Sequence, residues 1–274
     1  IVWNEFTAAI FSDFLSRYYK NKYIVNVRDI FDETKIILNE KILTKRLNKC
    51  LRYSAFSTVS SPGFCKYITN KADILFVHSI NSEICPPVSI NVKKTLNRPI
   101  HILYLGRISY PDMACKLLDR FGNDSRFLIQ VFGEGSEVVD EYAKNNGCKN
   151  VEIKGRFNKN NTEEYLSQAD IIFNVYGNER HCEQTALSNK LYYAVCLNAP
   201  ILVSPNTSMA EITKEIGIGF EIDLDSESDV CDELFNWYQD FNLSEVHIKC
   251  ETFKNEAWKS HSELHGRLRN ILLL

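Results

Sequence analysis

From residue 100 onward, short apolar runs alternate with segments that have the apolar spacing of helices. Strands are predicted at residues 100–105, 127–132, 151–155, 170–175, 200–204 and 220–224, with helices between them at 112–121, 137–145, 162–168, 190–197 and 209–216. Strands this apolar must be covered on both faces, and their alternation with helices is typical of parallel strands joined by crossover connections. The second half of the chain is therefore predicted to form a doubly wound α/β domain.

The first 80 residues repeat this alternation in a shorter form. Strands are predicted at 23–27, 55–59 and 74–77, and helices at 34–53 and 62–70. The stretch that follows contains Pro86 and Pro87 and has no periodicity, which is typical of a linker. We therefore expect a partial α/β domain at 1–85, a linker at 86–99, a second α/β domain at 100–243, and a helical tail at 244–274 that packs back toward the first domain.

Composition and charge narrow the possible functions. The 274 residues are 45% hydrophobic and 24% charged, which is ordinary globular composition and excludes collagen-like and disordered chains. The formal net charge is -3, so we expect no nucleic-acid partner, and any anion-binding surface must be local. No apolar run approaches the roughly 20 residues that cross a bilayer. The protein is therefore expected to be soluble or to rest on a membrane face.

The cysteine pattern indicates the redox compartment. The nine cysteines are odd in number and scattered, and no two have Cys-x-x-Cys spacing. Thiolate metal sites need clustered ligands, and a secreted disulfide framework favours an even count. We therefore expect reduced thiols in a cytoplasmic protein, and no thiolate metal site.

The residues just after each strand are the first place to look for a ligand site, because ligands of open parallel sheets bind beyond the carboxyl ends of the strands. Gly106 and Arg107 follow the first strand of the second domain. A glycine lets the backbone approach a ligand, and an arginine supplies a forked cation for phosphate. Gly133, Glu134 and Gly135 follow the next strand, in a bend suited to a base or a sugar. A turn glycine and a surface arginine are the alternative interpretation.

The segment before the helix at 190–197 suggests an anion site. Ser188 or Asn189 can cap this helix, and Lys190 lies in its first turn. A cation is unfavourable at a helix N-terminus, so a compensating group is expected there. A bound diphosphate would provide one. A solvated lysine on a surface helix is the alternative.

The order of these motifs resembles the donor-binding domain of GT-B glycosyltransferases, most closely the group-1, family 4-like bacterial enzymes that build capsular and other surface polysaccharides. The resemblance rests on Gly106-Arg107, Gly133-Glu134-Gly135, Ala169-Asp170-Ile171-Ile172, Ser188-Asn189-Lys190-Leu191-Tyr192 ahead of Ala199-Pro200-Ile201-Leu202-Val203, and Gly217-Ile218-Gly219. Two segments of the first half, Asn26-Val27-Arg28-Asp29 and Val59-Ser60-Ser61-Pro62-Gly63-Phe64, resemble the later strands of that family's acceptor domain.

The resemblance implies two Rossmann-like doubly wound domains, the N-terminal one incomplete because its early strands and first glycine-rich loop would precede Ile1. It also implies a metal-independent transferase of the hexosyltransferase type that needs no cofactor. The donor would be a UDP- or GDP-type sugar, and the acceptor a saccharide or a lipid-linked molecule at the inner face of the cell membrane. Charge grows on the departing nucleoside diphosphate, and fixed cations and helix-end N–H groups would stabilise it.

The resemblance further implies a role for individual residues. Arg107 and Lys190 would pair with the donor diphosphate. The backbone of four consecutive residues would hold the phosphate oxygens, namely Ala186, Leu187, Ser188 and Asn189. Nucleotide contacts are implied for Gly106, Gly133, Glu134, Gly135, Val175 and Tyr176, and a ribose contact for Glu211.

The group that activates the acceptor hydroxyl is predicted from placement. His181 follows the fourth strand of the second domain and precedes the helix at 190–197, so a catalytic or sugar-contacting role competes with that of an ordinary loop histidine. Asp29, after the strand at 23–27, is also well placed, with a salt bridge to Arg28 or a helix cap as the alternative.

Two departures from the family pattern leave the mechanism open. Counting back from Pro200, Tyr193 and Thr185 stand where the family often has two glutamates, and Lys116 is the first lysine after the Gly-Arg pair. Asp223-Leu224-Asp225 has the letters of a metal-binding triplet but lies at a late strand end, so no metal is predicted. A sugar-nucleotide epimerase and a catalytically silent binding or assembly partner remain as alternatives.

The helix predicted from Thr34 to Tyr53 suggests a membrane contact. It is rich in cations and has an apolar side that includes Ile42, Leu43 and Leu47. A basic amphipathic helix can lie on anionic lipid, and a solvated charged face is the alternative.

Overall fold

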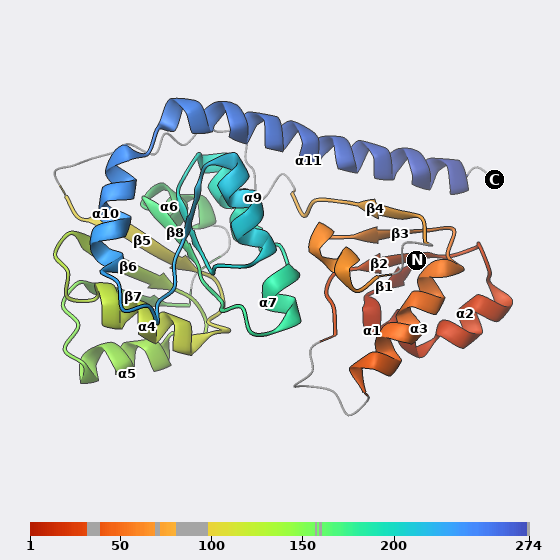
Figure 1. The fold of residues 1–274 in the computed structure, drawn as a ribbon, viewed down its shortest axis with the longest axis horizontal. Coiled ribbons are helices and arrows are strands. Elements are labelled where there is room, and N and C mark those ends of the chain that lie inside the picture. The colour runs from red at the N-terminus through yellow and green to blue at the C-terminus, as the bar shows by residue number, and fades with distance from the viewer. Residues whose placement is uncertain (32–38, 69–71, 81–97, 157, 159–160, 273–274) are drawn as a thin grey trace.

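The computed structural model of the chain describes residues 1–31, 39–68, 72–80, 98–156, 158 and 161–272. Two parallel sheets lie toward opposite ends of the molecule, and the long helix α11 runs past both of them (Figure 1). The linker predicted at 86–99 lies outside the described residues except for Arg98 and Pro99. No helix of the described residues is long and apolar enough to cross a membrane.

The N-terminal sheet has four parallel strands in sequence order. Its elements are β1 (Val2–Trp3), α1 (Glu5–Ile10), α2 (Ser12–Tyr18), β2 (Ile24–Val27), α3 (Glu40–Arg52), β3 (Phe56–Val59), the 3-10 helix η1 (Pro62–Lys66) and β4 (Ile74–Phe76). Successive side chains of a strand point to opposite faces. Val25 and Val27 therefore pack with Leu43 and Leu47 of α3, whereas Asn26 lines a cavity beside α11.

The C-terminal sheet has six parallel strands in the order β10-β9-β8-β5-β6-β7. The strands are β5 (Ile100–Leu105), β6 (Phe127–Phe132), β7 (Val151–Gly155), β8 (Ile171–Asn174), β9 (Ile201–Val203) and β10 (Gly219–Glu221). The helices are α4 (Pro111–Phe121), α5 (Glu137–Asn145), α6 (Thr162–Ser167), α7 (His181–Thr185), α8 (Asn189–Leu197), α9 (Ser208–Ile216), α10 (Val230–Asp240) and α11 (Leu243–Leu272).

Helices cover both faces of this sheet. Ile102 and Tyr104 of β5 belong to the core that contains Leu117 of α4. Leu103 of β5 belongs to the opposite core, with Leu191 of α8. This arrangement confirms the predicted doubly wound α/β fold. The strand order reverses between β5 and β8, which makes the crevice beyond their carboxyl ends the expected ligand site.

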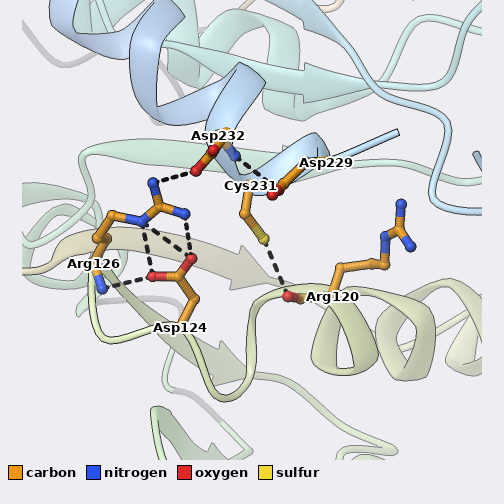
Figure 2. A network of polar contacts seen from close by, with 6 residues as sticks. All are labelled: Arg120, Asp124, Arg126, Asp229, Cys231 and Asp232. Carbon is orange, nitrogen blue, oxygen red and sulfur yellow. Dashed lines mark hydrogen bonds and ion pairs between the residues drawn. The ribbon is translucent and has the colours of Figure 1, made fainter. Parts of the chain in front are cut away.

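A polar network holds α10 against the sheet (Figure 2). The Arg126 guanidinium pairs with Asp124 and Asp232, each at 2.6 Å, and the Cys231 thiol donates to the carbonyl oxygen of Arg120 at 3.1 Å. Hydrogen bonds from Arg126 lower the pKa of Asp124. The network fixes the start of the helix that leads into α11.

The tail forms one long helix, α11, which contacts α8 and α9 of the C-terminal domain and β4 of the N-terminal sheet. The His261 ring nitrogen Nε2 donates to the carbonyl oxygen of His78 at 2.8 Å, and Arg267 pairs with Asp73 at 2.8 Å. The helix therefore ties the two sheets together.

Several local predictions were wrong. The segment predicted as a helix at 62–70 is the short 3-10 helix η1, and α1, α2, α7 and α10 were not predicted. Cys196 is disulfide-bonded, so the expectation that the thiols are all reduced is wrong at that position.

Candidate functional site

The loops after β5 and β6 lie against each other at the carboxyl edge of the C-terminal sheet. The Gly106 N–H donates to the carbonyl oxygen of Phe132 at 2.9 Å. A side chain at Gly133 would overlap the carbonyl oxygen of Gly106, so only glycine fits there. Gly106 has φ +118°, a conformation that favours glycine. The close approach of the two loops therefore requires Gly133, and the backbone conformation favours glycine at position 106.

Arg107 and Glu134 are exposed at this edge. Glu134 pairs with Arg156 at 2.7 Å, and its carbonyl oxygen accepts from the Ile108 N–H at 2.9 Å. Gly135 has φ +88° and completes the turn. Among the described residues, no ion pair holds the Arg107 guanidinium, so it is available to an anion.

The segment between α7 and α8 brings the two domains together. The Ser188 hydroxyl caps α8 by accepting from the Lys190 N–H at 3.2 Å, and the Ser188 carbonyl oxygen accepts from the Leu191 N–H at 3.0 Å. The Ser61 hydroxyl of the N-terminal domain donates to the carbonyl oxygen of Thr185. Ala186 packs against the N-terminal core. The predicted phosphate-binding segment therefore lies at the domain junction.

The compensating partner of Lys190 is a tyrosine. Lys190 is 6% exposed, and its ammonium donates to the Tyr176 hydroxyl at 2.5 Å. The ammonium also lies 5.0 Å from the centroid of the Tyr104 ring. Burial by itself would raise the pKa of Tyr176, but the Lys190 charge together with the hydrogen bonds from Lys190 and Ser188 outweighs it and lowers that pKa. A buried anionic or strongly polar partner is therefore already supplied by the protein.

Tyr176 also makes a stacking contact with a second tyrosine. Its ring stacks on Tyr110 with centroids 4.6 Å apart, and the Arg180 guanidinium lies 5.2 Å from the Tyr110 ring centroid. Arg180 pairs with Glu183 at 2.5 Å. Burial is the main cause that raises the pKa of Tyr110 to about 12, so this hydroxyl stays protonated.

A cavity of about 180 Å³ lies where these groups meet. It is lined by residues at or after the carboxyl ends of β5, β8 and β9, by α7 and the segment that follows it, by the start of α9, and by one carboxylate of the N-terminal domain: Asp29, Tyr110, Asn174, Tyr176, Gly177, Cys182, Glu183, Ala186, Leu187, Ser188, Ser204, Thr207 and Met209. A larger hollow of about 520 Å³ adjoins it, and both are lined by Tyr110, Tyr176, Gly177, Glu183 and Ser204. The site therefore combines groups from both sheets.

Two buried polar atoms at this site have no hydrogen-bond partner within the described part of the chain. They are the Oδ1 atom of Asn174, which lines the smaller cavity, and the hydroxyl of Tyr104 beside Lys190. Unpaired buried polar atoms are costly, because each has lost its hydrogen bonds to water. Of the two, the Asn174 amide oxygen faces the cavity, whereas Tyr104 lines neither hollow.

The remaining predicted residues are spread around the junction. His181 does not line the smaller cavity; its Nδ1 atom lies 3.3 Å from Glu40 Oε1, and its ring packs on Tyr67. Asn189 lines a different cavity of about 400 Å³, between the N-terminal sheet and α11. Glu211 is exposed in the first turn of α9 and lines none of these cavities.

Lys116 and the acidic triplet Asp223-Leu224-Asp225 lie next to each other. Lys116 of α4 pairs with Asp225 at 2.5 Å, and Asp223 lines the same 520 Å³ hollow. The ion pair partly neutralises Asp225. Within the described residues there is no group of three or more histidine, cysteine, aspartate or glutamate side chains placed to hold a metal ion.

Sequence reasoning missed Tyr110, Asn174, Ser204 and Glu183 as site residues. Asn174 and Ser204 end or follow apolar strands, and a polar residue at that place was the available signal. The Ser204 hydroxyl accepts from the N–H groups of Tyr176 and Gly177, at 3.1 and 2.9 Å, and so shapes the loop. Tyr110 and Glu183 carry no such signal, because only the tertiary fold brings them to Tyr176.

Most of the apolar side of α3 is buried. Leu43, Leu47 and Leu51 are buried in the N-terminal core, and of the apolar residues of this helix Ile42 is 52% exposed. Leu43, Leu47 and Leu51 are therefore not available to lipid, and a membrane contact of this helix stays a prediction. Residues 34–38 of the predicted segment lie outside the described residues.

The sequence matches no protein-family profile and no curated protein sequence. Solved structures share its fold. A sucrose-phosphate synthase from Thermosynechococcus elongatus gives a TM-score of 0.71 at 12% identity, over 98% of this chain and 72% of that one. A glycosyltransferase from Rickettsia africae gives 0.62 at 12% identity, over 98% and 81%. HepE from Anabaena, in complex with UDP, gives 0.65 at 10% identity, over 97% and 76%. At such identities the likeness shows the fold, which is GT-B.

Proposed function

We propose that the protein is a glycosyltransferase of surface polysaccharide assembly that moves a sugar from a nucleotide-diphosphate donor to a saccharide or lipid-linked acceptor. The observation that carries the proposal is the cavity at the strand-order reversal, where Asp29 of one sheet faces the cap of α8 in the other domain. The fold of sugar transferases supports it, and so does HepE, which has been solved with UDP and with UDP and glucose.

The residues present suit a donor diphosphate. Its oxygens would accept hydrogen bonds from the N–H group of Asn189 at the start of α8 and from the Arg107 guanidinium. Lys190 would join them when its bond to Tyr176 opens. These fixed cations would stabilise the charge that grows on the departing diphosphate, without a metal ion.

The acceptor side of the reaction falls to Asp29. The acceptor oxygen bonds to the anomeric carbon, the bond from that carbon to the diphosphate breaks, and the acceptor proton must leave. Asp29 lines the cavity, whereas His181 is turned toward Glu40 and Tyr67. We therefore favour Asp29 over His181 as the acceptor-side base. The Asn174 amide would contact a sugar hydroxyl.

The test is calorimetric binding of UDP and GDP, followed by assays of transfer and donor hydrolysis with a panel of UDP- and GDP-sugars. We expect one nucleotide to bind and its sugar to be transferred, with Arg107→Ala weakening binding by about tenfold or more. Arg269→Ala is the matched control, because Arg269 is an exposed arginine on α11.

The other outcomes separate the alternatives. Tight nucleotide binding without turnover would instead support a silent binding partner, which the replacement of two glutamates by Thr185 and Tyr193 favours. A changed sugar on the nucleotide would identify an epimerase. Absence of binding to either nucleotide would overturn the site.

A further inference from the structure

An open groove of about 790 Å³ runs along one side of α3. Tyr67, at the end of η1, also lines it, and the Asn48 amide of α3 donates to the Tyr67 carbonyl oxygen at 3.2 Å. This hydrogen bond holds the end of η1 against the helix. Four of the residues that line the groove are cations, namely Lys41, Lys45, Lys49 and Arg52, so we call it the basic groove.

The cations recur along one face of the helix. They are spaced by four, four and three residues, which places them on successive turns over a length of about 16 Å. Lys41, Lys45 and Arg52 are exposed and form no ion pair among the described residues, whereas Lys49 pairs with Asp13 at 2.6 Å. The groove therefore has a local excess of positive charge, although the whole chain carries -3.

One end of the basic groove reaches the domain junction. Glu40, the acidic residue among those described as lining the groove, lies 3.3 Å from the Nδ1 atom of His181. The Tyr67 ring centroid lies 4.7 Å from that of His181. Cys182 and Glu183, the next two residues of the chain, line the donor cavity. The groove therefore leads from the donor cavity along α3.

Aromatic rings lie at both ends of the groove. Tyr67 is at the junction, and Tyr53 follows the last turn of α3, where the Lys20 ammonium lies 5.1 Å from its ring centroid. A tyrosine offers an apolar ring face and a polar tip, so it can cover the C–H face of a sugar. Thr44 and Asn48 line the groove between the cations and add neutral hydrogen-bonding groups. The lining therefore suits a ligand that has both sugar rings and negative charge.

We propose that the basic groove binds an acidic oligosaccharide, a chain of sugars that carry acidic groups, and that this chain is the acceptor of the proposed glycosyl transfer. Its acidic groups pair with cations on successive turns of α3, and its sugar rings lie on the tyrosines. The end of the chain then reaches the donor cavity beside His181. The acceptor role rests on the proposed function, whereas the binding does not.

A longer polyanion is a poorer occupant. The positive charge is confined to the groove, and a chain that extended beyond it would lie against a protein of net charge -3. A short oligosaccharide meets only the local field of the groove.

Titration of the full chain with hexagalacturonate tests the binding. Maltohexaose is the neutral glycan for comparison, and inorganic polyphosphate is the polyanion without sugar rings. We expect hexagalacturonate to bind with an affinity that falls as salt is added, because salt screens exposed charges. Maltohexaose should bind about tenfold or more weakly, since it makes no ion pairs. Polyphosphate should also bind more weakly than hexagalacturonate.

Two sets of substitutions separate the contribution of charge from that of the ring. Lys41→Glu with Lys45→Glu should weaken hexagalacturonate binding by about tenfold or more, because an exposed ion pair contributes up to about fivefold and the reversed charges repel. Tyr53→Leu keeps an apolar side chain but loses the flat ring, and it should weaken binding by about threefold.

Each set has a matched control. Lys149→Glu with Lys259→Glu makes the same change in net charge at exposed positions elsewhere. Tyr18→Leu removes another exposed ring that has a cation beside it, outside the groove. Both controls should bind hexagalacturonate as the parent chain does. Circular dichroism and calorimetry with UDP and GDP on every variant show whether the fold and the donor site are intact.

The acceptor role is tested by kinetics. With a donor sugar that is transferred, Lys41→Glu with Lys45→Glu should raise the KM for an acidic acceptor and leave kcat unchanged, since the groove holds the acceptor away from the reacting atoms. An equal KM in the parent chain and this double variant would overturn the acceptor role.

The outcomes separate the basic groove from the donor site. Hexagalacturonate binding that the double variant loses, in a chain that binds neither nucleotide, would support the groove and overturn the proposed function. Nucleotide binding and sugar transfer without hexagalacturonate binding would overturn the groove and leave the proposed function. Equal affinity for polyphosphate and hexagalacturonate would also overturn the proposal, because the groove would then take any polyanion.

Discussion

The buried ammonium of Lys190 has its polar partner in the side chain of Tyr176. The sequence indicated that a cation in the first turn of a helix needs a compensating group, and the Tyr176 hydroxyl supplies it at 2.5 Å. A donor diphosphate at this site would compete with that hydroxyl. Tyr176 is therefore expected to oppose donor binding until its side chain moves.

Tyr176→Phe tests this competition. The variant leaves the buried ammonium without its hydrogen bond, so the free protein should lose about 1–3 kcal/mol of unfolding free energy. Binding of UDP or GDP should become tighter, because the diphosphate no longer displaces a partner. Thermal unfolding and calorimetry measure the two effects. Tyr110→Phe, which keeps the stacked ring, is the control, and weaker nucleotide binding by Tyr176→Phe would contradict the expectation.

Gly133→Ala tests the close approach of the two strand-end loops. An added methyl group would overlap the carbonyl oxygen of Gly106, so the loops must separate. We expect a loss of about 1–3 kcal/mol in unfolding free energy and weaker nucleotide binding. Gly266→Ala is the control, because nothing lies within 4 Å of that added methyl and alanine favours a helix. In urea unfolding, Gly133→Ala should lower the free energy of unfolding, whereas Gly266→Ala should raise it or change it much less.

At the scale of elements, the junction of β4, α8 and α11 is held by a buried histidine. His78 is 8% exposed and contacts the Tyr192 hydroxyl at 3.2 Å. Burial is the main cause that lowers its pKa to about 4, with the nearby His261 adding to it. The ring is therefore neutral at pH 7.

This junction predicts a pH dependence of stability. In the unfolded chain His78 takes up a proton below pH of about 6.5, whereas in the folded protein it does so near pH 4. The free energy of unfolding should therefore fall as pH drops from about 6.5 to 4, by up to about 3 kcal/mol. Urea unfolding across this range measures the effect. His78→Gln does not titrate and should show a flatter profile; identical profiles would contradict the assignment.

Elements with strong local periodicity were predicted well, and those that depend on packing were not. The strands of the C-terminal sheet and helices α4, α5 and α8 follow the apolar pattern, because each buries a face set by its own period. Helix α2 was missed because its aromatic residues remain exposed. The apolar side of α3 was recognised, but its burial beneath α1 and α2 could not be read from one helix.

At the scale of the whole molecule, the two domains meet at Gly63 and Ser61. A side chain at Gly63 would overlap the Ser208 hydroxyl and lie 2.7 Å from the Thr185 carbonyl oxygen, both from the other domain. The contact is made at Thr185, a few residues before Ser188, which caps α8. The distance between the domains therefore depends on a residue without a side chain.

Gly63→Val should push the domains apart. We expect a larger radius of gyration by small-angle scattering, separation of the unfolding curve into two steps, and a loss of transfer activity. Ser61→Ala removes the hydrogen bond to Thr185 and the one accepted from the Gly63 N–H, and should cost about 1–3 kcal/mol with the radius unchanged. An unchanged scattering curve for Gly63→Val would show that this contact does not set the spacing.

The sequence by itself determined the doubly wound α/β fold and the loops that form the candidate site, because strand and helix periods and strand-end glycines act locally. Only the tertiary structure decided that Asp29 lines the cavity and His181 does not, that Tyr176 pairs with Lys190, and that α2 exposes aromatic side chains while α3 buries most of its apolar side. These outcomes depend on contacts between segments far apart in the chain, which no local pattern encodes.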